Sequence, residues 1–231
     1  PYNWTVIGAL PDLQAATLED VKEFYHQYYG AGNATLVIAG DIDIAQTKTL
    51  VQQWFGEIKR GPEVKALPPM PVSLEETKSV YFPDNFATLP EIRMIFPTVE
   101  QYHADEAALN ILGQLLSGNK TSPLYQVLVE QKKLAPGITS NQSSSEIAGE
   151  FVFRVRANAG VDLDSVKLAI EAGIDLFENN GFKDNELTRI KAKLETDLYR
   201  GIETVLNKAF TLVIDNEFTG DPAHIIKSAE Q

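Results

Sequence analysis

The chain has 231 residues, of which 44% are hydrophobic, and its formal net charge is −12. This length allows one large domain or two small ones, and the apolar content argues against a disordered chain. The acidic balance argues against nucleic acid and anionic lipid as partners, because phosphate contacts need clustered Lys and Arg. There is no cysteine, which excludes disulfides and Cys-ligated metal, and no apolar run nears the roughly 20 residues that span a bilayer.

The first third of the chain predicts a helix, a strand and a second helix. Thr17 and Asp20 have a spacing close to that of a capping box, and the apolar residues after them recur at helical intervals. Residues 36–39 form a continuous apolar run between turn residues, which is typical of a strand buried on both faces. Asp43 is the expected N-cap of the second helix.

A proline-rich segment follows and predicts a domain boundary. Pro62, Pro68, Pro69 and Pro71 remove backbone donors and fix local dihedral angles, so neither a helix nor a central strand is expected there. We interpret this segment as a semi-rigid linker. The sequence thus predicts one part over residues 1–66 and a second, larger domain over residues 67–231.

The second part predicts strands interleaved with helices. Strands are expected at 77–82 and 91–96, helices at 104–118 and 122–135, a hairpin within 137–157, and helices at 164–179, 184–199 and 205–218. The return strand of the hairpin alternates Phe151, Phe153 and Val155 with more polar positions. This pattern predicts an α+β fold, a two-layer sandwich of a mainly antiparallel sheet covered by helices.

Residue spacing gives no catalytic constellation. The histidines His26, His103 and His224 lie too far apart for the paired histidines of a zinc peptidase motif. Asp41 and Asp43 are explained by a turn and an N-cap, because no calcium-binding loop follows them. We therefore predict no catalytic, cofactor-binding or metal-ligating residue in this chain.

Two arginines in the return strand allow two interpretations. Arg154 and Arg156 lie two positions apart, so they share one face of the strand. They could bind a carboxylate, or they could form a solvated sheet face, which is the commoner situation.

Beyond these patterns, many residues of the first third follow one recurring order. They are Pro1, Tyr2, Gly8, Thr17, Asp20, Phe24, Tyr25, Tyr28, Tyr29, Asn33, Ala34, Thr35, Leu36, Val37, Gly40, Asp41 and Asp43. This order resembles the M16 zinc metallopeptidases, the family of insulinase, pitrilysin and mitochondrial processing peptidase. The later stretch "GNKTSPLYQVLVEQKKLA" is similar to a glycine and helix segment of the same family, so the resemblance covers nearly the whole chain.

The resemblance implies a role without catalysis. In the family, an inverted H-x-x-E-H motif and a downstream Glu hold zinc, and both precede the segment that matches Pro1 and Tyr2. Residues 1–66 are therefore expected to be the end of a metal-bearing domain, and residues 67–231 the second, inactive domain of the M16/LuxS-MPP-like metallohydrolase fold. Zinc is expected in the parent protein and not in this chain, which should cleave nothing alone.

The same resemblance implies a place in the parent enzyme. The family's substrate-gripping Arg and Tyr align with Val129 and Pro136, so this copy is expected to follow a metal-bearing domain and not to grip substrate itself. It would help to enclose peptides or unfolded polypeptides in a chamber with the other M16 half or subunit. The alternative is that the parent is a catalytically inactive structural or regulatory subunit of an M16 peptidase complex.

Two further expectations concern surroundings. The strand at 36–39 would lack most of its sheet, so residues 1–66 are expected to pack against the second domain or to form a homodimer by swapping. Bacterial relatives are frequently exported, so the periplasm is the leading compartment.

Overall fold

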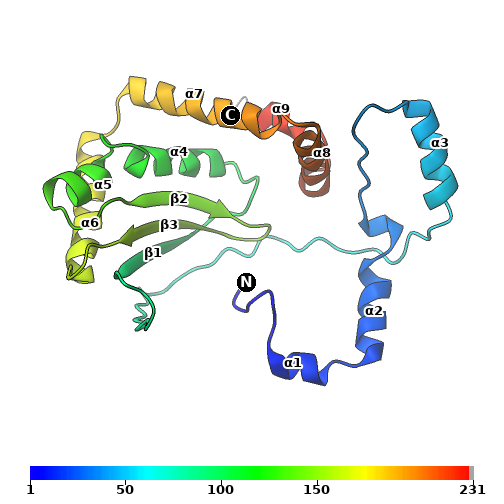
Figure 1. The fold of residues 1–231 in the computed structure, drawn as a ribbon, viewed down its shortest axis with the longest axis horizontal. Helices are drawn as coiled ribbons and strands as arrows, with labels where there is room; N and C mark the ends of the chain where they lie inside the picture. Colours follow the sequence, from blue (N-terminus) through cyan, green and yellow to red (C-terminus); the bar gives the residue numbers. More distant parts are fainter. Residues whose placement is uncertain (229–231) are drawn as a thin grey trace. The chain divides into compact units, whose positions relative to one another are not determined.

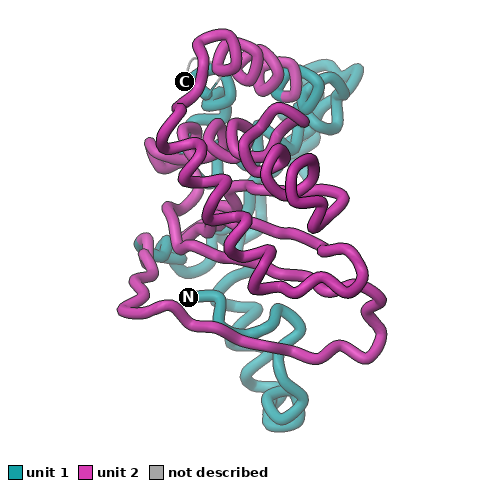
Figure 2. Tube along the Cα trace, turned by 90° about the vertical axis from the view of Figure 1, so that its left-hand side faces the viewer, with its two compact units in different colours: residues 1–68, 198–231 teal, residues 69–197 magenta. Residues whose placement is uncertain are grey.

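The computed structural model describes residues 1–228, and it contains two compact units (Figures 1 and 2). Unit 1 comprises residues 1–68 and the chain from residue 198, and unit 2 comprises residues 69–197. The domain assignment of residues 1–66 and 67–231 stays a prediction, and the end of that second range, residues 229–231, lies outside the described residues. Over residues 1–228, no helix is both long and apolar enough to cross a bilayer.

Unit 2 is built on an antiparallel sheet of three strands, β1 (Glu91–Thr98), β2 (Thr139–Ser144) and β3 (Gly149–Arg156). Their order is β1-β3-β2, so β3 is central and pairs with both neighbours. The hairpin and the strand near residues 91–96 are as predicted. The α+β sandwich predicted from the sequence is therefore confirmed.

Helices cover one face of this sheet. They are α4 (Glu106–Ser117), the short α5 (Pro123–Tyr125) continued by the π-helix η2 (Gln126–Gln131), and α6 (Leu163–Asn180). Figure 1 shows α4 lying over the sheet, and α4 packs on β2 while α6 contacts β1. The next helix along the chain, α7 (Asp184–Gly201), contains the boundary between the two units, which lies between residues 197 and 198.

Alternation along β3 determines which side chains are buried. Phe151, Phe153 and Val155 point to the helix layer and are buried, since successive residues of a strand face opposite sides. They pack with fully buried helix residues, among them Leu124 and Ile170. The core of unit 2 therefore fills the space between the sheet and the helices, and the other sheet face is left to solvent.

Gly113 allows α4 to approach the sheet closely. An added Cβ at this position would lie 2.8 Å from the backbone oxygen of Ser140 in β2. The same two elements are joined by hydrogen bonds: Ser140 Oγ donates to the Gly113 carbonyl at 3.0 Å, and Ser140 N donates to Ser117 Oγ at 2.8 Å. The spacing between the helix and strand β2 is thus fixed by atoms of both backbones.

Unit 1 contains helices with little tertiary packing. They are α1 (Leu10–Ala15), α2 (Leu18–Tyr28), the 3-10 turn η1 (Ala31–Asn33), α3 (Ile44–Phe55), α8 (Val205–Thr219) and α9 (His224–Ser228). The predicted N-termini are confirmed. Thr17 and Asp20 form a capping box on α2, and the Gln46 amide donates to Asp43 Oδ1 at the start of α3.

Two predicted strands are absent from the described residues. Residues 36–39 and 77–82 belong to no ladder, and Val80, Tyr81 and Phe82 are each at least 80% exposed. The pattern prediction was wrong there because an apolar or β-branched run indicates a strand only where a neighbouring strand satisfies the backbone groups. No residue within 1–68 is buried, although this segment carries many aromatic side chains.

Candidate functional site

The face of the sheet opposite the helices is a regular array of side chains. Going along the paired strands β1 and β3, Glu91 lies opposite Arg156, Arg93 opposite Arg154, and Ile95 opposite Val152. On the other side of β3, Thr139 lies beside Arg154 and Asn141 beside Val152. We name this surface the open face. The sequence predicted that Arg154 and Arg156 share a face, and the alternation of β3 confirms it.

One carboxylate organises the charged end of the open face. Arg93 Nε donates to Glu91 Oε1 at 2.8 Å, and Arg154 Nη2 donates to Glu91 Oε2 at 2.9 Å. Arg156 Nη2 is 3.6 Å from the same Oε2. Both sequence interpretations of the arginines are therefore combined: they contact a carboxylate, and they do so on an exposed sheet face.

The cluster of Glu91, Arg93, Arg154 and Arg156 has an excess of positive charge. Like charges directly opposite each other on paired strands repel, and Arg93 faces Arg154 in this way. Glu91 relieves that repulsion, and hydrogen bonds from Arg154 and then Arg93 lower the pKa of Glu91 from 4.5 to about 2. One anion among three cations leaves two positive charges uncompensated within the cluster. The pKa of Arg154 is raised by the same carboxylate.

The carboxylate of Glu91 is less exposed to solvent than the guanidinium groups around it. The Glu91 side chain is 22% exposed, whereas those of Arg93 and Arg156 are 56% and 62% exposed. The anion therefore lies beneath a layer of cations that water and solutes can reach. Next to it, half-exposed Ile95 and Val152 form an aliphatic row on the same face.

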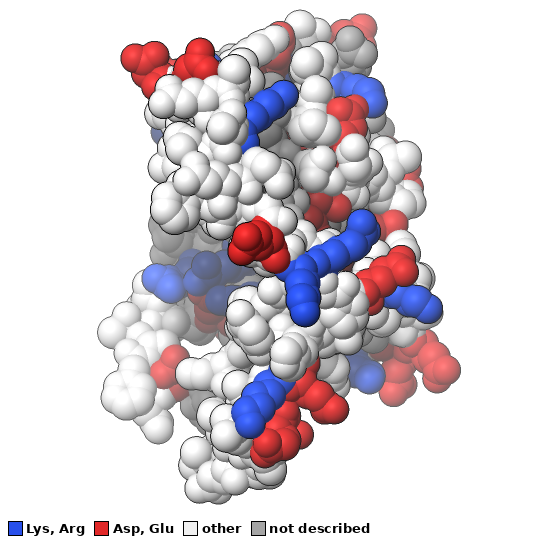
Figure 3. Space-filling view, turned by 90° about the vertical axis from the view of Figure 1, so that its right-hand side faces the viewer, with Lys and Arg blue, Asp and Glu red and all other residues white. Residues whose placement is uncertain are grey.

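The face of the molecule drawn in Figure 3 carries mixed charge. On the face seen in Figure 3, basic and acidic side chains are interspersed among wide uncharged areas, so this face presents no broad field of one sign. A local excess of cations in a chain of net charge −12 is therefore a feature that distinguishes the open face from the bulk composition.

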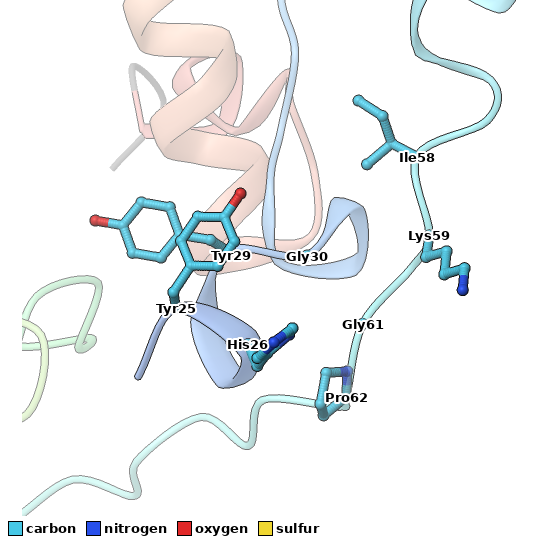
Figure 4. Close-up of a pocket in the computed structure, with 8 residues that line it drawn as sticks. All are labelled: Tyr25, His26, Tyr29, Gly30, Ile58, Lys59, Gly61 and Pro62. Carbon is cyan, nitrogen blue, oxygen red and sulfur yellow. The ribbon is translucent and has the colours of Figure 1, made fainter. Parts of the chain in front are cut away.

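Unit 1 contains a separate concave site of about 320 Å³ (Figure 4). It lies between the end of α2, where Tyr25 and His26 belong to the helix and Tyr29 is its C-cap, and a segment of irregular chain at residues 58–62. The Gly32 amide donates to the Arg60 carbonyl at 2.7 Å, which holds the two segments together. No carboxylate lines this pocket within the described residues, so it offers no acid–base pair around His26.

The histidines that were weighed in the sequence lie in separate places. His26 lines the pocket of unit 1, His103 lies 3.7 Å from Asp105 just before α4, and His224 begins α9. Among residues 1–228 there is no group of three or more His, Cys, Asp or Glu residues with the geometry to hold a metal ion.

The segment from Val129 to Pro136, whose two end residues align with the family's substrate-gripping Arg and Tyr, has an unusual backbone. Val129 lies within the π-helix η2 and packs partly buried against the core, while Pro136 is exposed. Lys133, between them, has a φ of 53°, in the left-handed region that non-glycine residues rarely occupy. Neither aligned side chain offers a charge or a hydroxyl group to a substrate.

Comparison with known families agrees with this architecture. The model of the family described as "Peptidase M16 inactive domain" matches residues 15–194. The chain belongs to this family. The M16 resemblance inferred from the sequence is thereby confirmed.

Relatives of this M16 chain carry protease names. It is 27% identical over 208 residues to the zinc protease PqqE of Helicobacter pylori, an alignment that covers 88% of this chain and 46% of that protein. The crystal structure of a peptidase M16 inactive domain from Pseudomonas fluorescens matches all of this chain and 54% of its own, with 19% identity and a TM-score of 0.77. The first half of the periplasmic protease PqqL from Escherichia coli matches 97% of this chain and 50% of its own, with 16% identity and a TM-score of 0.69.

The chain spans about half the length of the curated relatives that it matches. It corresponds to the inactive domain of the M16 family, and one solved structure that it resembles is described as the first half of PqqL.

Sequence reasoning missed two members of the charged cluster. Glu91 and Arg93 lie two positions apart in a strand that was predicted, so their shared face could have been recognised. Their proximity to Arg154 and Arg156 could not, because it depends on the register between strands about 63 residues apart in the chain.

Proposed function

We propose that this chain is the non-catalytic segment of a zinc-dependent endopeptidase, and that its open face forms part of the wall that encloses peptide substrates. The observation that supports this role most directly is the asymmetry of the sheet in unit 2. Helices cover one face, and the other presents exposed cations, an aliphatic row and polar side chains from all three strands. Such a surface can contact an extended polypeptide without adding any catalytic group.

A site-specific photo-crosslinker in the full-length protein tests this role. Asn141 is exposed on the open face, and Lys167 is exposed on α6, which packs on the opposite side of the core. We expect a benzophenone amino acid at position 141 to capture an unfolded model polypeptide, and the same group at position 167 to capture none. Equal capture at both positions would contradict the proposed orientation.

Zinc is proposed to belong to the whole protein and to be held by residues outside these 231. Relatives named as zinc proteases support this proposal. Elemental analysis of the full-length gene product, with the 231-residue chain as the blank, should give near one zinc per chain in the former and none in the latter. No zinc in either would favour the alternative, an inactive structural or regulatory subunit. Stoichiometric zinc in the 231-residue chain would overturn the proposal.

The partner of the exposed aromatic surface of unit 1 is proposed to be another part of the M16 assembly, either the other half or a second copy. Residues 1–68 contain no buried side chain, and Trp4, Phe24 and Trp54 are each more than half exposed, which is costly in water. In the absence of the other half, a second copy should cover this surface, so light scattering should show the isolated 231-residue chain as a dimer or larger. A monomer in which these residues exchange rapidly with deuterated solvent would contradict this expectation.

The periplasm is the proposed compartment of this protein, because the structurally similar protease PqqL is described as periplasmic.

A further inference from the structure

We propose that the open face selects acidic peptides, with the guanidinium groups of Arg93, Arg154 and Arg156 binding a substrate carboxylate beside an aliphatic side chain held on Ile95 and Val152. This inference rests on the proposed function, since it takes an extended polypeptide as the ligand. It adds the chemical class of the bound peptide and the spacing between its acidic and aliphatic residues.

The first argument is the capacity of the cluster for a second anion. A guanidinium group has five N–H donors in a planar fork that matches a carboxylate. The hydrogen bonds to Glu91 use one donor of Arg93 and one of Arg154. Within residues 1–228, Arg156 forms one ion pair, to Glu91 at 3.6 Å, and no hydrogen bond to it. The cluster therefore has both surplus charge and surplus donors, and a carboxylate satisfies both.

The second argument is that, within strands β1, β2 and β3, the open face carries one acidic residue besides Glu91, and that residue lies too far away to neutralise the surplus. Glu150 also points to the open face, because it lies four positions from Arg154 on β3. Four residues of strand separate the two by about 13 Å, which exceeds the screening length of about 8 Å at physiological ionic strength. The excess charge stays local to the end of the sheet that holds Glu91.

The third argument is geometric and fixes the spacing in the ligand. Arg154 and Val152 are two residues apart on β3, and Arg93 and Ile95 are two residues apart on β1. Side chains on one face of an extended peptide repeat at the same interval, about 6.6–6.8 Å. A peptide running along these strands with Glu or Asp at one position and Leu, Ile or Val two positions away would place its carboxylate on the cations and its apolar side chain on Ile95 and Val152.

Binding of short labelled peptides to the 231-residue chain tests the inference by fluorescence anisotropy at low salt. The probes are an acetylated, amidated peptide with a single Glu-Ala-Leu unit between Gly-Ser flanks, its counterpart with Gln in place of Glu, and a version with the order Glu-Leu-Ala between the same flanks. We expect the first to bind about tenfold more tightly than the Gln peptide, as charge-assisted hydrogen bonds at an exposed site allow. The reordered peptide should lose part of that gain, because its Leu lies next to the Glu and points to the opposite side.

Variants locate the effect on the protein. Arg93→Gln combined with Arg156→Gln keeps the Glu91–Arg154 pair and should abolish the preference for Glu over Gln. Lys167→Gln combined with Lys191→Gln removes the same charge from exposed helix positions and should leave the preference unchanged. Arg93→Lys combined with Arg156→Lys keeps the charge and should retain part of it. Circular dichroism verifies that each variant is folded.

The outcomes separate this inference from the proposed function. Equal binding of the Glu and Gln peptides would overturn acid selectivity while leaving the enclosing wall intact. A preference that survives loss of Arg93 and Arg156, or that disappears in the lysine control, would also overturn it. Absence of binding by every peptide would count against both proposals, and crosslinking at position 141 without any acid preference would count against the inference alone.

Discussion

The close contact between α4 and β2 makes Gly113→Ala a sharp test of how the sheet is held. In most helix interiors this substitution stabilises a protein, because alanine loses less backbone entropy than glycine. Here the new Cβ would lie 2.8 Å from the Ser140 carbonyl oxygen and 3.3 Å from the Asn141 Cα. Both contacts are to backbone atoms, which cannot rotate away as the end of a side chain can.

The expected size of the effect follows from three opposing contributions. Helix propensity favours alanine by about 1 kcal/mol, whereas forcing an extra methyl group into a packed contact typically costs about 1–3 kcal/mol. Displacing α4 also weakens the hydrogen bond from Ser140 Oγ to the Gly113 carbonyl, a loss of about 1 kcal/mol. The balance is a destabilisation of about 1–3 kcal/mol, or a fall in Tm of roughly 4 °C for each kcal/mol in a domain of this size.

Thermal unfolding and hydrogen exchange measure this result. Gly201→Ala is the matched control, because Gly201 ends α7 and has no atom within 4 Å of its ideal Cβ position. We expect circular dichroism to give a lower Tm for Gly113→Ala and an unchanged or higher Tm for Gly201→Ala. Amides of residues 139–144 should exchange faster only in the first variant. If Gly113→Ala were as stable as the control, the reasoning about the helix–sheet contact would be refuted.

Other substitutions test the core, a helix cap and the charged cluster. Phe153→Ala should destabilise unit 2 by about 3–5 kcal/mol in urea unfolding, since it empties a buried site beside two other rings; a loss below 1 kcal/mol would contradict the assigned core. Asp162→Ala should cost about 1 kcal/mol because Asp162 Oδ2 accepts from the Ser165 amide at 3.0 Å, and Asp162→Asn should retain most of that stability. Glu91 has its pKa lowered from 4.5 to about 2 in the folded state, so its carboxylate stabilises the fold above pH 4.5 and loses that contribution as the pH falls toward 2. The stability difference between the wild type and Glu91→Gln should therefore be larger at pH 6 than at pH 3, and a difference that grows on acidification would exclude this linkage.

The parts of the fold that the sequence predicted are those with local signals. Helix starts at Thr17 and Asp43 depend on a side chain and an amide three residues away, and the alternation of β3 depends only on its own residues. Both were correct. The strands expected at 36–39 and 77–82 need a partner strand, and pattern alone does not supply one.

The same distinction applies to the candidate site. That Arg154 and Arg156 share a face follows from the two-residue period of a strand. That Glu91 bridges them to Arg93 follows from the pairing of β1 with β3, which only the folded chain reveals. The family was recognisable because many weak residue matches fall in one order along the chain. This order can be read directly from the sequence, whereas the geometry of a site cannot.

The two-sided character of β3 has a consequence for how such domains diverge and how they can be engineered. Its residues form two alternating sets. The odd-numbered positions 151, 153 and 155 are packed in the core, and the even-numbered positions 152, 154 and 156 form part of the open face. Because the two sets make separate contacts, changes in one should add to changes in the other with little interaction. Substitutions confined to the even-numbered residues of β3 should therefore change which ligands the open face binds, while the melting temperature of unit 2 stays nearly constant.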